Sequence, residues 1–173
     1  MGIEFFFDCS SPWTYLGFHN VLKLASEMAV PIRWRPILVG GIFNSVNPSV
    51  YESRRSPVPA KEAYAQKSLQ DWARWSGLQL KTRPTVFPVN SVKVMRACIV
   101  LEPEGKLVAF ARAAFEAYWR DDLDISQDTV VRSLCRSISV DDAALLEAIE
   151  ARAVKEALRA NTDELMERGG FGS

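Results

Sequence analysis

The chain has 173 residues, of which 48% are hydrophobic and 24% are charged, as in an ordinary folded domain. Lysine plus arginine and aspartate plus glutamate both number 21, so the chain lacks the basic excess that a nucleic-acid binder normally shows. No apolar run approaches the ~20 residues that span a bilayer. No export signal is visible at the N-terminus, so we expect a cytoplasmic protein that does not associate with membranes.

The cysteines and the single histidine argue against a metal centre. Cys9, Cys98 and Cys135 are widely spaced and form neither a Cys-x-x-Cys pair nor a set of zinc ligands. His19 is the only histidine, so we expect no metal site built from protein ligands alone. Cys98 and Cys135 are predicted to be small core residues. A functional role for Cys9 stays open, because a nearby helix N-terminus can depress the pKa of a thiol.

The opening stretch combines a strand with a candidate site. Residues 3–7 read IEFFF, which predicts a short buried strand. Ser11 then suits a helix N-cap and Pro12 the first helical position, and the helix is expected to run to about residue 28. The Ser11 hydroxyl would lie beside unpaired backbone N–H groups, where a thiolate or carboxylate is favoured. The alternative is that Ser11 is a helix cap and nothing more.

The rest of the chain predicts one more strand and then helices. Residues 31–37 suggest a second strand, 38–43 a flexible connection with two glycines, and 44–59 a loop or broken helix. No strand pattern appears after that. The helices are expected over residues 60–76, from 92 onward, over 107–119, from a capping box at 124–127 to about 137, and over 141–150 and 153–168.

Tryptophans and polar residues add two expectations in the helical part. Trp72, Trp75 and Trp119 are predicted to pack in its core. Asn90 or Ser91 is predicted to cap the helix that begins near residue 92.

Four motifs together resemble a known family: FDxxSPxxYL at 7–16, GGIF at 40–43, FPVNS at 87–91 and DIS at 124–126. The chain resembles the 2-hydroxychromene-2-carboxylate isomerases, which are relatives of kappa-class glutathione transferases and of DsbA-like disulfide oxidoreductases. The resemblance implies an α/β fold, a thioredoxin-like βαβ domain interrupted by an all-helical insertion. Its C-terminal ββα part would lie beyond this sequence. The implied division is 1–43 for the first half, 44–168 for the insertion and 169–173 for the return.

The resemblance also assigns roles at the opening helix. Ser11-Pro12-Trp13-Thr14 occupies the place of the Cys-x-x-Cys motif of disulfide-exchanging relatives, and serine and threonine form no disulfide. Ser11 is implied to donate a hydrogen bond to the thiolate of bound glutathione, which lowers the pKa of that thiol. Pro12 and Trp13 are implied to contact glutathione. Ser173 matches the residue whose backbone pairs with the cysteinyl group of glutathione.

For the substrate, the resemblance implies a small aromatic or unsaturated carboxylic acid, to which the glutathione thiolate adds reversibly. Its carboxylate needs cationic or amide groups. The candidates are Arg54, Arg55, Lys61, Asn47 and Asn90, together with Asn44, which stands where relatives often carry a lysine. A solvated loop remains the alternative for the arginine pair, and a plain helix cap the alternative for Asn90.

Two other functions of the chain also stay open. One is a kappa-class-like glutathione transferase or peroxidase that uses the same site. Another is a non-catalytic binding module that keeps the fold. The resemblance further implies a homodimer.

Overall fold

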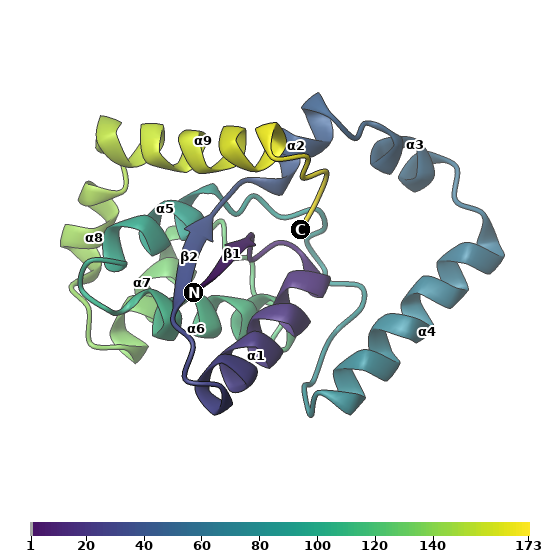
Figure 1. Ribbon diagram of the computed structural model, residues 1–173, viewed down its shortest axis with the longest axis horizontal. Helices are drawn as coiled ribbons and strands as arrows, with labels where there is room; N and C mark the ends of the chain where they lie inside the picture. Colours follow the sequence, from purple (N-terminus) through teal and green to yellow (C-terminus); the bar gives the residue numbers. More distant parts are fainter. Residues whose placement is uncertain (1) are drawn as a thin grey trace.

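Two parallel strands lie at the centre of the computed structural model, which describes residues 2–173 (Figure 1). Strand β1 (Ile3–Phe7) pairs with β2 (Ile32–Pro36), and Phe7 lies opposite Pro36. Helix α1 (Pro12–Glu27) connects them. The predicted strand–helix–strand unit is therefore confirmed.

Helix α1 begins as its sequence predicts. Ser11 is the N-cap with an extended backbone, and its hydroxyl oxygen accepts a hydrogen bond from the Thr14 amide at 3.2 Å. Pro12 occupies the first turn, where its missing N–H leaves no bond unmade.

The glycine pair after β2 lies in a helix, so the predicted flexible connection is wrong. Helix α2 (Val39–Ser45) includes both glycines. Its first amide, that of Val39, donates to the Asp8 carboxylate at 2.8 Å, and Ile42 is fully buried. A carboxylate at a helix N-terminus satisfies a free N–H and offsets the weak helix propensity of glycine.

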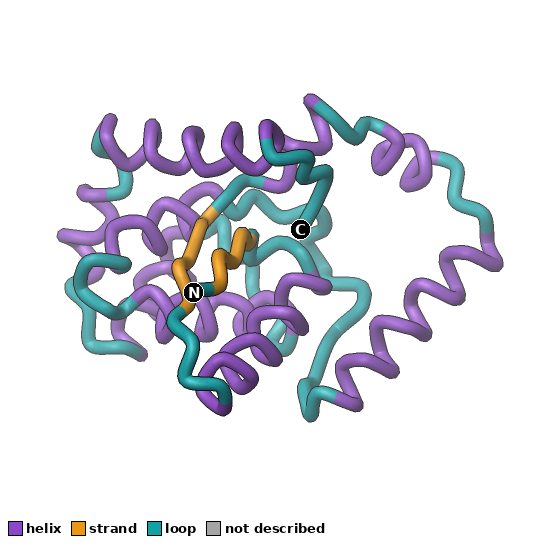
Figure 2. Tube along the Cα trace, in the orientation of Figure 1, coloured by secondary structure: helices purple, strands orange, loops and turns teal. Residues whose placement is uncertain are grey.

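The remaining elements are helices, and the described residues contain no strand apart from β1 and β2 (Figure 2). Helix α3 (Ser49–Arg55) is short and has no buried residue, as expected of a broken helix between 44 and 59. The later helices are α4 (Pro59–Trp75), α5 (Val92–Leu101), α6 (Leu107–Trp119), α7 (Asp128–Ser137), α8 (Asp142–Ala148) and α9 (Arg152–Glu167).

The predicted start of α7 is wrong by one turn. The helix begins at Asp128 with Gln127 as its N-cap. Asp124 instead closes a turn before the helix, where its carboxylate accepts from the Ser126 amide at 3.0 Å. The expected capping box is therefore a turn motif, because an aspartate can bond its own backbone two residues on.

Aromatic rings from both halves of the sequence share one core. Phe115 of α6 stacks on Tyr15 with ring centroids 5.3 Å apart and also packs against Phe7 and Phe18. Trp119 is buried, as predicted. The predicted burial of Cys98 and Cys135 is also confirmed.

Helix α4 packs less deeply than predicted and stands at the edge of the molecule (Figure 1). Only Leu69 and Ala73 of this helix are buried, against Leu16 of α1. Trp72 and Trp75 pack edge to face on each other but are 50% and 73% exposed, so the prediction that they are core residues is wrong. Across residues 2–173, no helix has the length and apolarity needed to span a bilayer.

Candidate functional site

A cleft of about 1110 Å³ opens at the N-terminal end of α1. Its walls are the first turn of α1, the start of α2, parts of α3 and α4, the 87–92 segment, and Ser173. In Figure 1 these elements surround the region where the C-terminal segment approaches α1. Ligand pockets usually measure about 300–1,000 Å³, so the cleft has room for a peptide-sized ligand and a small second molecule.

Ser11 lies in the wall of this cleft at the positive end of α1. Its hydroxyl donates to the Ser173 carbonyl at 2.7 Å while accepting from the Thr14 amide. The residue is only 6% exposed. Ser173, the acceptor of this bond, also lines the cleft, and the dipole of α1 favours a negative charge at this helix N-terminus.

A buried carboxylate, that of Asp8, organises the floor of the cleft. Its two oxygens accept from the Ser10 amide at 2.9 Å and the Val39 amide at 2.8 Å. Its backbone carbonyl accepts from the Ser11 amide at 3.1 Å. Asp8 thus joins the start of α1 to the start of α2. Burial raises the pKa of this carboxyl group, and the hydrogen bonds from Ser10 and Val39 oppose that rise.

Asp8 is a site residue that the sequence did not predict. The sequence signal that could have pointed to Asp8 is an acidic residue between a buried strand and a helix cap. Its hydrogen-bond partner Val39, however, lies 31 residues away. No local pattern identifies that pair.

The predicted site residues divide into two groups. Three of them do not line the cleft: Asn44, Asn47 and Arg55. The amide of Asn47 instead donates to the Phe171 carbonyl at 3.0 Å. The predicted residues that do line the cleft are Ser11, Pro12, Trp13, Arg54, Lys61, Asn90 and Ser173.

Asn90 also serves the adjacent helix. Its side-chain oxygen accepts from the Val92 amide at 3.0 Å, whereas Ser91, the N-cap of α5, makes no side-chain capping bond. Asn90 therefore both caps the start of α5 and lines the cleft.

Three aromatic rings surround the Arg54 guanidinium at the cleft. The centroids of Phe87, Phe43 and Tyr51 lie 5.1, 5.7 and 5.9 Å from its central carbon. All four residues line the cleft. No local sequence pattern predicts this group of rings, because they come from three separate segments.

Cys9 does not face this cleft. Its side chain is fully buried, and the indole N–H of Trp119 donates to its carbonyl at 3.0 Å. Burial raises the pKa of the Cys9 thiol well above its usual value, and the neighbouring Cys98 adds to the effect. The functional role that the sequence left open for Cys9 as a thiolate is therefore not supported.

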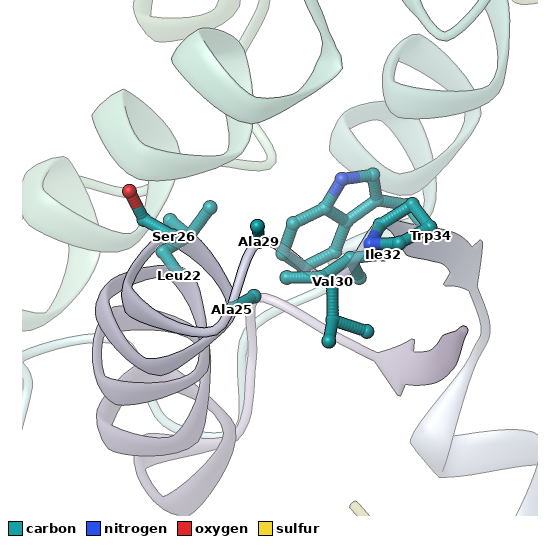
Figure 3. A pocket seen from close by; sticks show the side chains of 8 residues that line it. Leu22, Ala25, Ser26, Ala29, Val30, Ile32 and Trp34 are labelled. Atoms are coloured by element: carbon teal, nitrogen blue, oxygen red, sulfur yellow. The ribbon is translucent and has the colours of Figure 1, made fainter. Parts of the chain in front are cut away.

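A second hollow, of about 430 Å³, lies between the end of α1 and the start of β2 (Figure 3). The labelled side chains around it are aliphatic apart from Ser26 and the Trp34 ring. None of the residues that line it titrates. It offers no group for acid–base or nucleophilic chemistry.

A family model described as the DSBA-like thioredoxin domain matches residues 2–173. The chain belongs to this family. The chain is 27% identical to glutathione S-transferase kappa 2 of Caenorhabditis elegans, over 99% of this chain and 78% of that protein. It is 25% identical to the 2-hydroxychromene-2-carboxylate isomerase of Pseudomonas putida, over 99% of this chain and 82% of that protein.

Solved structures agree with this assignment at the level of fold. A 2-hydroxychromene-2-carboxylate isomerase structure superposes with a TM-score of 0.81 at 23% identity, covering 99% of this chain and 82% of that chain. The cytosolic disulfide reductase DsbM from Pseudomonas aeruginosa, solved with GSH, gives a TM-score of 0.65 at 14% identity. The match covers 99% of this chain and 84% of that chain. The predicted resemblance and the predicted thioredoxin-like α/β fold with a helical insertion are confirmed.

Within this DSBA-like domain, the chemistry of the first turn of α1 is limited by its residues. Ser11 and Thr14 stand there, and neither forms a disulfide. The turn combines a hydroxyl donor, a helix N-terminus and a neighbouring cleft. This arrangement can bind an anion and stabilise its charged form.

Proposed function

We propose that this DSBA-like domain is a glutathione-dependent isomerase of a small aromatic or unsaturated carboxylic acid. The observation that carries the proposal is the Ser11 hydroxyl, which lies at the N-terminus of α1 and borders the large cleft. Relatives named isomerase and glutathione transferase, each matched over nearly the whole of this chain, support it.

The residues around Ser11 fit a polar, thiol-bearing tripeptide. The buried hydroxyl oxygen of Ser173, a residue that lines the cleft, has no hydrogen-bond partner within residues 2–173, so a polar ligand would satisfy a group that is costly to leave unpaired. Lys61 and Asn90 line the same cleft and can bind carboxylate or peptide groups.

When bound, glutathione would supply a thiolate that adds reversibly to a conjugated double bond and leaves again after the bond has rotated. The Ser11 hydroxyl would donate its hydrogen bond to the sulfur instead of to the Ser173 carbonyl, its present acceptor at 2.7 Å. This hydrogen bond and the α1 N-terminus both favour the charged form of the sulfur. Trp13, 46% exposed at the cleft, would cover the ligand from one side.

The experiment is calorimetric titration of reduced glutathione into the wild type and Ser11→Ala, with thiolate formation followed by ultraviolet absorbance. We expect Ser11→Ala to bind glutathione more weakly and to raise the pKa of the bound thiol, because the donor is lost. Ser11→Thr keeps a donor and should restore much of both. No heat of binding in the wild type, or an unchanged thiol pKa in Ser11→Ala, would reject the proposal in favour of a non-catalytic binding module.

A matched control separates catalysis from helix capping. Asp141 caps α8 away from the cleft by accepting from the Ala143 and Ala144 amides. Ser11→Ala and Asp141→Ala should each lose about 1 kcal/mol of stability. Only Ser11→Ala should change glutathione binding.

The similarity to a kappa-class transferase favours one alternative, conjugation or peroxide reduction at the same site. Product analysis separates the two activities. Conjugation consumes glutathione in step with the product, whereas isomerisation returns it.

A further inference from the structure

The buried carboxylate of Asp8 joins the beginnings of three helices at the floor of the cleft. One oxygen accepts from the Ser10 amide at 2.9 Å, just before α1, and the other accepts at 2.8 Å from the amide of Val39, the first residue of α2. Burial raises the pKa of this carboxyl group, and the hydroxyl of Ser91, the buried N-cap residue of α5, is among the groups that oppose the rise. Three segments that are distant in the sequence thus meet at one side chain.

The hydrogen bonds of Asp8 require two acceptor oxygens. Both amides that bond to it can only donate, which suits an ionised carboxylate and not a side-chain amide, because an amide has one oxygen and one NH2 group. The charge also lies at helix N-termini, where N–H groups favour an anion. Asp8 is only 1% exposed, so water hardly competes for these bonds. The side chain is therefore a fixed link between α1 and α2.

The turn that Asp8 holds also determines the position of the Ser11 hydroxyl. The Asp8 carbonyl accepts from the Ser11 amide at 3.1 Å while its carboxylate holds the Ser10 amide, so Asp8 binds two consecutive N–H groups just before α1. The Ser11 oxygen in turn accepts from the Thr14 amide at 3.2 Å. A change in the turn would therefore move the only side-chain hydroxyl that caps α1.

Asp8 also acts on the site through its charge, and this effect has the opposite sign. A negative charge near the N-terminus of α1 disfavours a second negative charge there, so removing it would by itself lower the pKa of a bound thiol. Loss of a well-placed Ser11 donor would raise that pKa, because the donor stabilises the thiolate. The direction of the change therefore distinguishes a positioning effect from a charge effect.

We propose, resting on the function proposed above, that Asp8 is a positioning residue whose carboxylate, by holding the beginnings of α1 and α2 together, places the Ser11 hydroxyl for the sulfur of bound glutathione. Asp8 acts through Ser11. The benefit of a fixed donor exceeds the repulsion between Asp8 and the thiolate, because the N–H groups that bond to the carboxylate already offset part of its charge.

The test compares the pKa of the thiol of reduced glutathione bound to the wild type and to Asp8→Asn, followed by ultraviolet absorbance. Asparagine keeps the shape of the side chain but turns an NH2 group toward one of the two donating amides. We expect the pKa of the bound thiol to rise by about 0.5–1, part of the rise of about 1–2 that loss of the whole Ser11 hydrogen bond should cause. A fall in this pKa, or no change, overturns the inference.

A second variant, Val39→Pro, removes one hydrogen bond and leaves the charge of Asp8 in place. Proline is tolerated at the first position of a helix, and Leu38 before it already has the extended backbone that a following proline requires. The pKa of the bound thiol should rise here too, by less than in Asp8→Asn. This variant decides the matter if Asp8→Asn does not fold, and an unchanged pKa in it overturns the inference.

A double variant tests whether Asp8 acts through Ser11. Ser11→Ala has no hydroxyl to place, so adding Asp8→Asn to it should not raise the pKa of the bound thiol further. A further rise would mean that Asp8 acts by another route, against the inference.

Asp141→Asn is the matched control, because Asp141 caps α8 by accepting from two amides and does not line the cleft. It should lower the melting temperature and leave the pKa of the bound thiol unchanged. A rise of that pKa in the control would show that lost stability alone suffices, and the positioning role of Asp8 would be rejected.

Hydrogen exchange separates this inference from the proposed function. Failure of glutathione to bind the wild type rejects the proposed function, but the placement of Ser11 is still measured at the Thr14 amide, which bonds to its oxygen. In Asp8→Asn this amide should exchange about fivefold faster relative to the Ala144 amide of α8, in line with the usual effect of losing a helix cap. An unchanged ratio overturns the inference whether or not glutathione binds.

Discussion

Single side chains at the cleft each serve the fold and the site together. The Ser11 hydroxyl caps α1 and borders the cleft, and the Asp8 carboxylate begins α2 while holding the Ser10 amide. Such dual roles explain why a substitution at either position needs a separate measurement of stability. The Asp141 control described above provides that measurement for Ser11.

Asp122 is a second polar side chain that joins distant segments. Its carboxylate accepts from the Thr85 amide at 2.7 Å and pairs with Lys81, so it holds the connection that carries Phe87 against the end of α6. These contacts with Lys81 and Thr85 lower the pKa of Asp122 to about 2. Its backbone is left-handed, with φ of 59°, a conformation that aspartate and asparagine tolerate.

We predict that Asp122→Asn flattens the acid dependence of stability. Because the folded pKa lies below the unfolded value of 3.8, the carboxylate contributes stability above that value and loses it as the pH falls toward about 2. Urea unfolding across this pH range should show a smaller loss of unfolding free energy for the variant than for the wild type. Asparagine keeps the left-handed backbone, so backbone strain does not confuse the comparison. If the unfolding free energies of the two proteins fell in parallel as the pH was lowered, the prediction would be contradicted.

Among the elements, the end of α9 is defined by two glycines. Gly169 has φ of 88°, and the Gly170 amide donates to the Leu165 carbonyl at 2.8 Å, which closes the helix. A Cβ at Gly170 would lie 2.5 Å from Cγ of Leu165 and 2.9 Å from its carbonyl oxygen. Since the carbonyl belongs to the helix backbone, a side-chain rotation alone cannot relieve the clash.

We therefore predict that Gly170→Ala destabilises the protein by about 1–3 kcal/mol, the usual cost of overpacking. It should also disturb the path of residues 171–173 to Ser11. Gly40→Ala is the comparison, because a Cβ there meets nothing within 4 Å and the residue lies in α2. That substitution should be neutral or stabilising by about 0.5–1 kcal/mol. Thermal unfolding of both variants checks the pair, and equal melting temperatures would refute the steric argument.

At the scale of the whole molecule, one core spans the predicted division of the chain. Phe115 belongs to the segment 44–168, yet it packs against Phe7, Tyr15 and Phe18 of the segment 1–43. The division at residues 43 and 168 stays a prediction, as does the homodimer. The shared core implies that the two segments stabilise each other.

We predict that Phe115→Ala lowers the free energy of unfolding by about 3–5 kcal/mol, because it leaves a cavity at a fully buried site. Unfolding in urea should remain a single transition when followed by both tryptophan fluorescence and far-ultraviolet circular dichroism. Phe171→Ala is the control, since Phe171 is 71% exposed and its loss should change stability by less than about 0.5 kcal/mol. Two separate transitions would show that the segments fold independently.

Local patterns in the sequence determined the strand–helix–strand unit, most later helices and the position of Ser11. Each of these depends on residues close together in the chain, such as the apolar run 3–7 and the serine–proline cap. The start of α7 failed for a local reason, the turn that Asp124 closes with the Ser126 amide, whereas two other failed expectations depended on remote partners. The helix α2 begins because Val39 meets Asp8, and Trp72 is exposed because little of the chain covers α4.

The composition of the cleft was decided by the tertiary structure. Arg54 and Arg55 look equivalent in the sequence, but neighbouring helical residues point in directions about 100° apart. Only Arg54 lines the cleft and meets rings from other segments. A local pattern can predict a helix cap from adjacent residues, whereas a binding surface depends on which distant side chains the packing of the whole chain brings together.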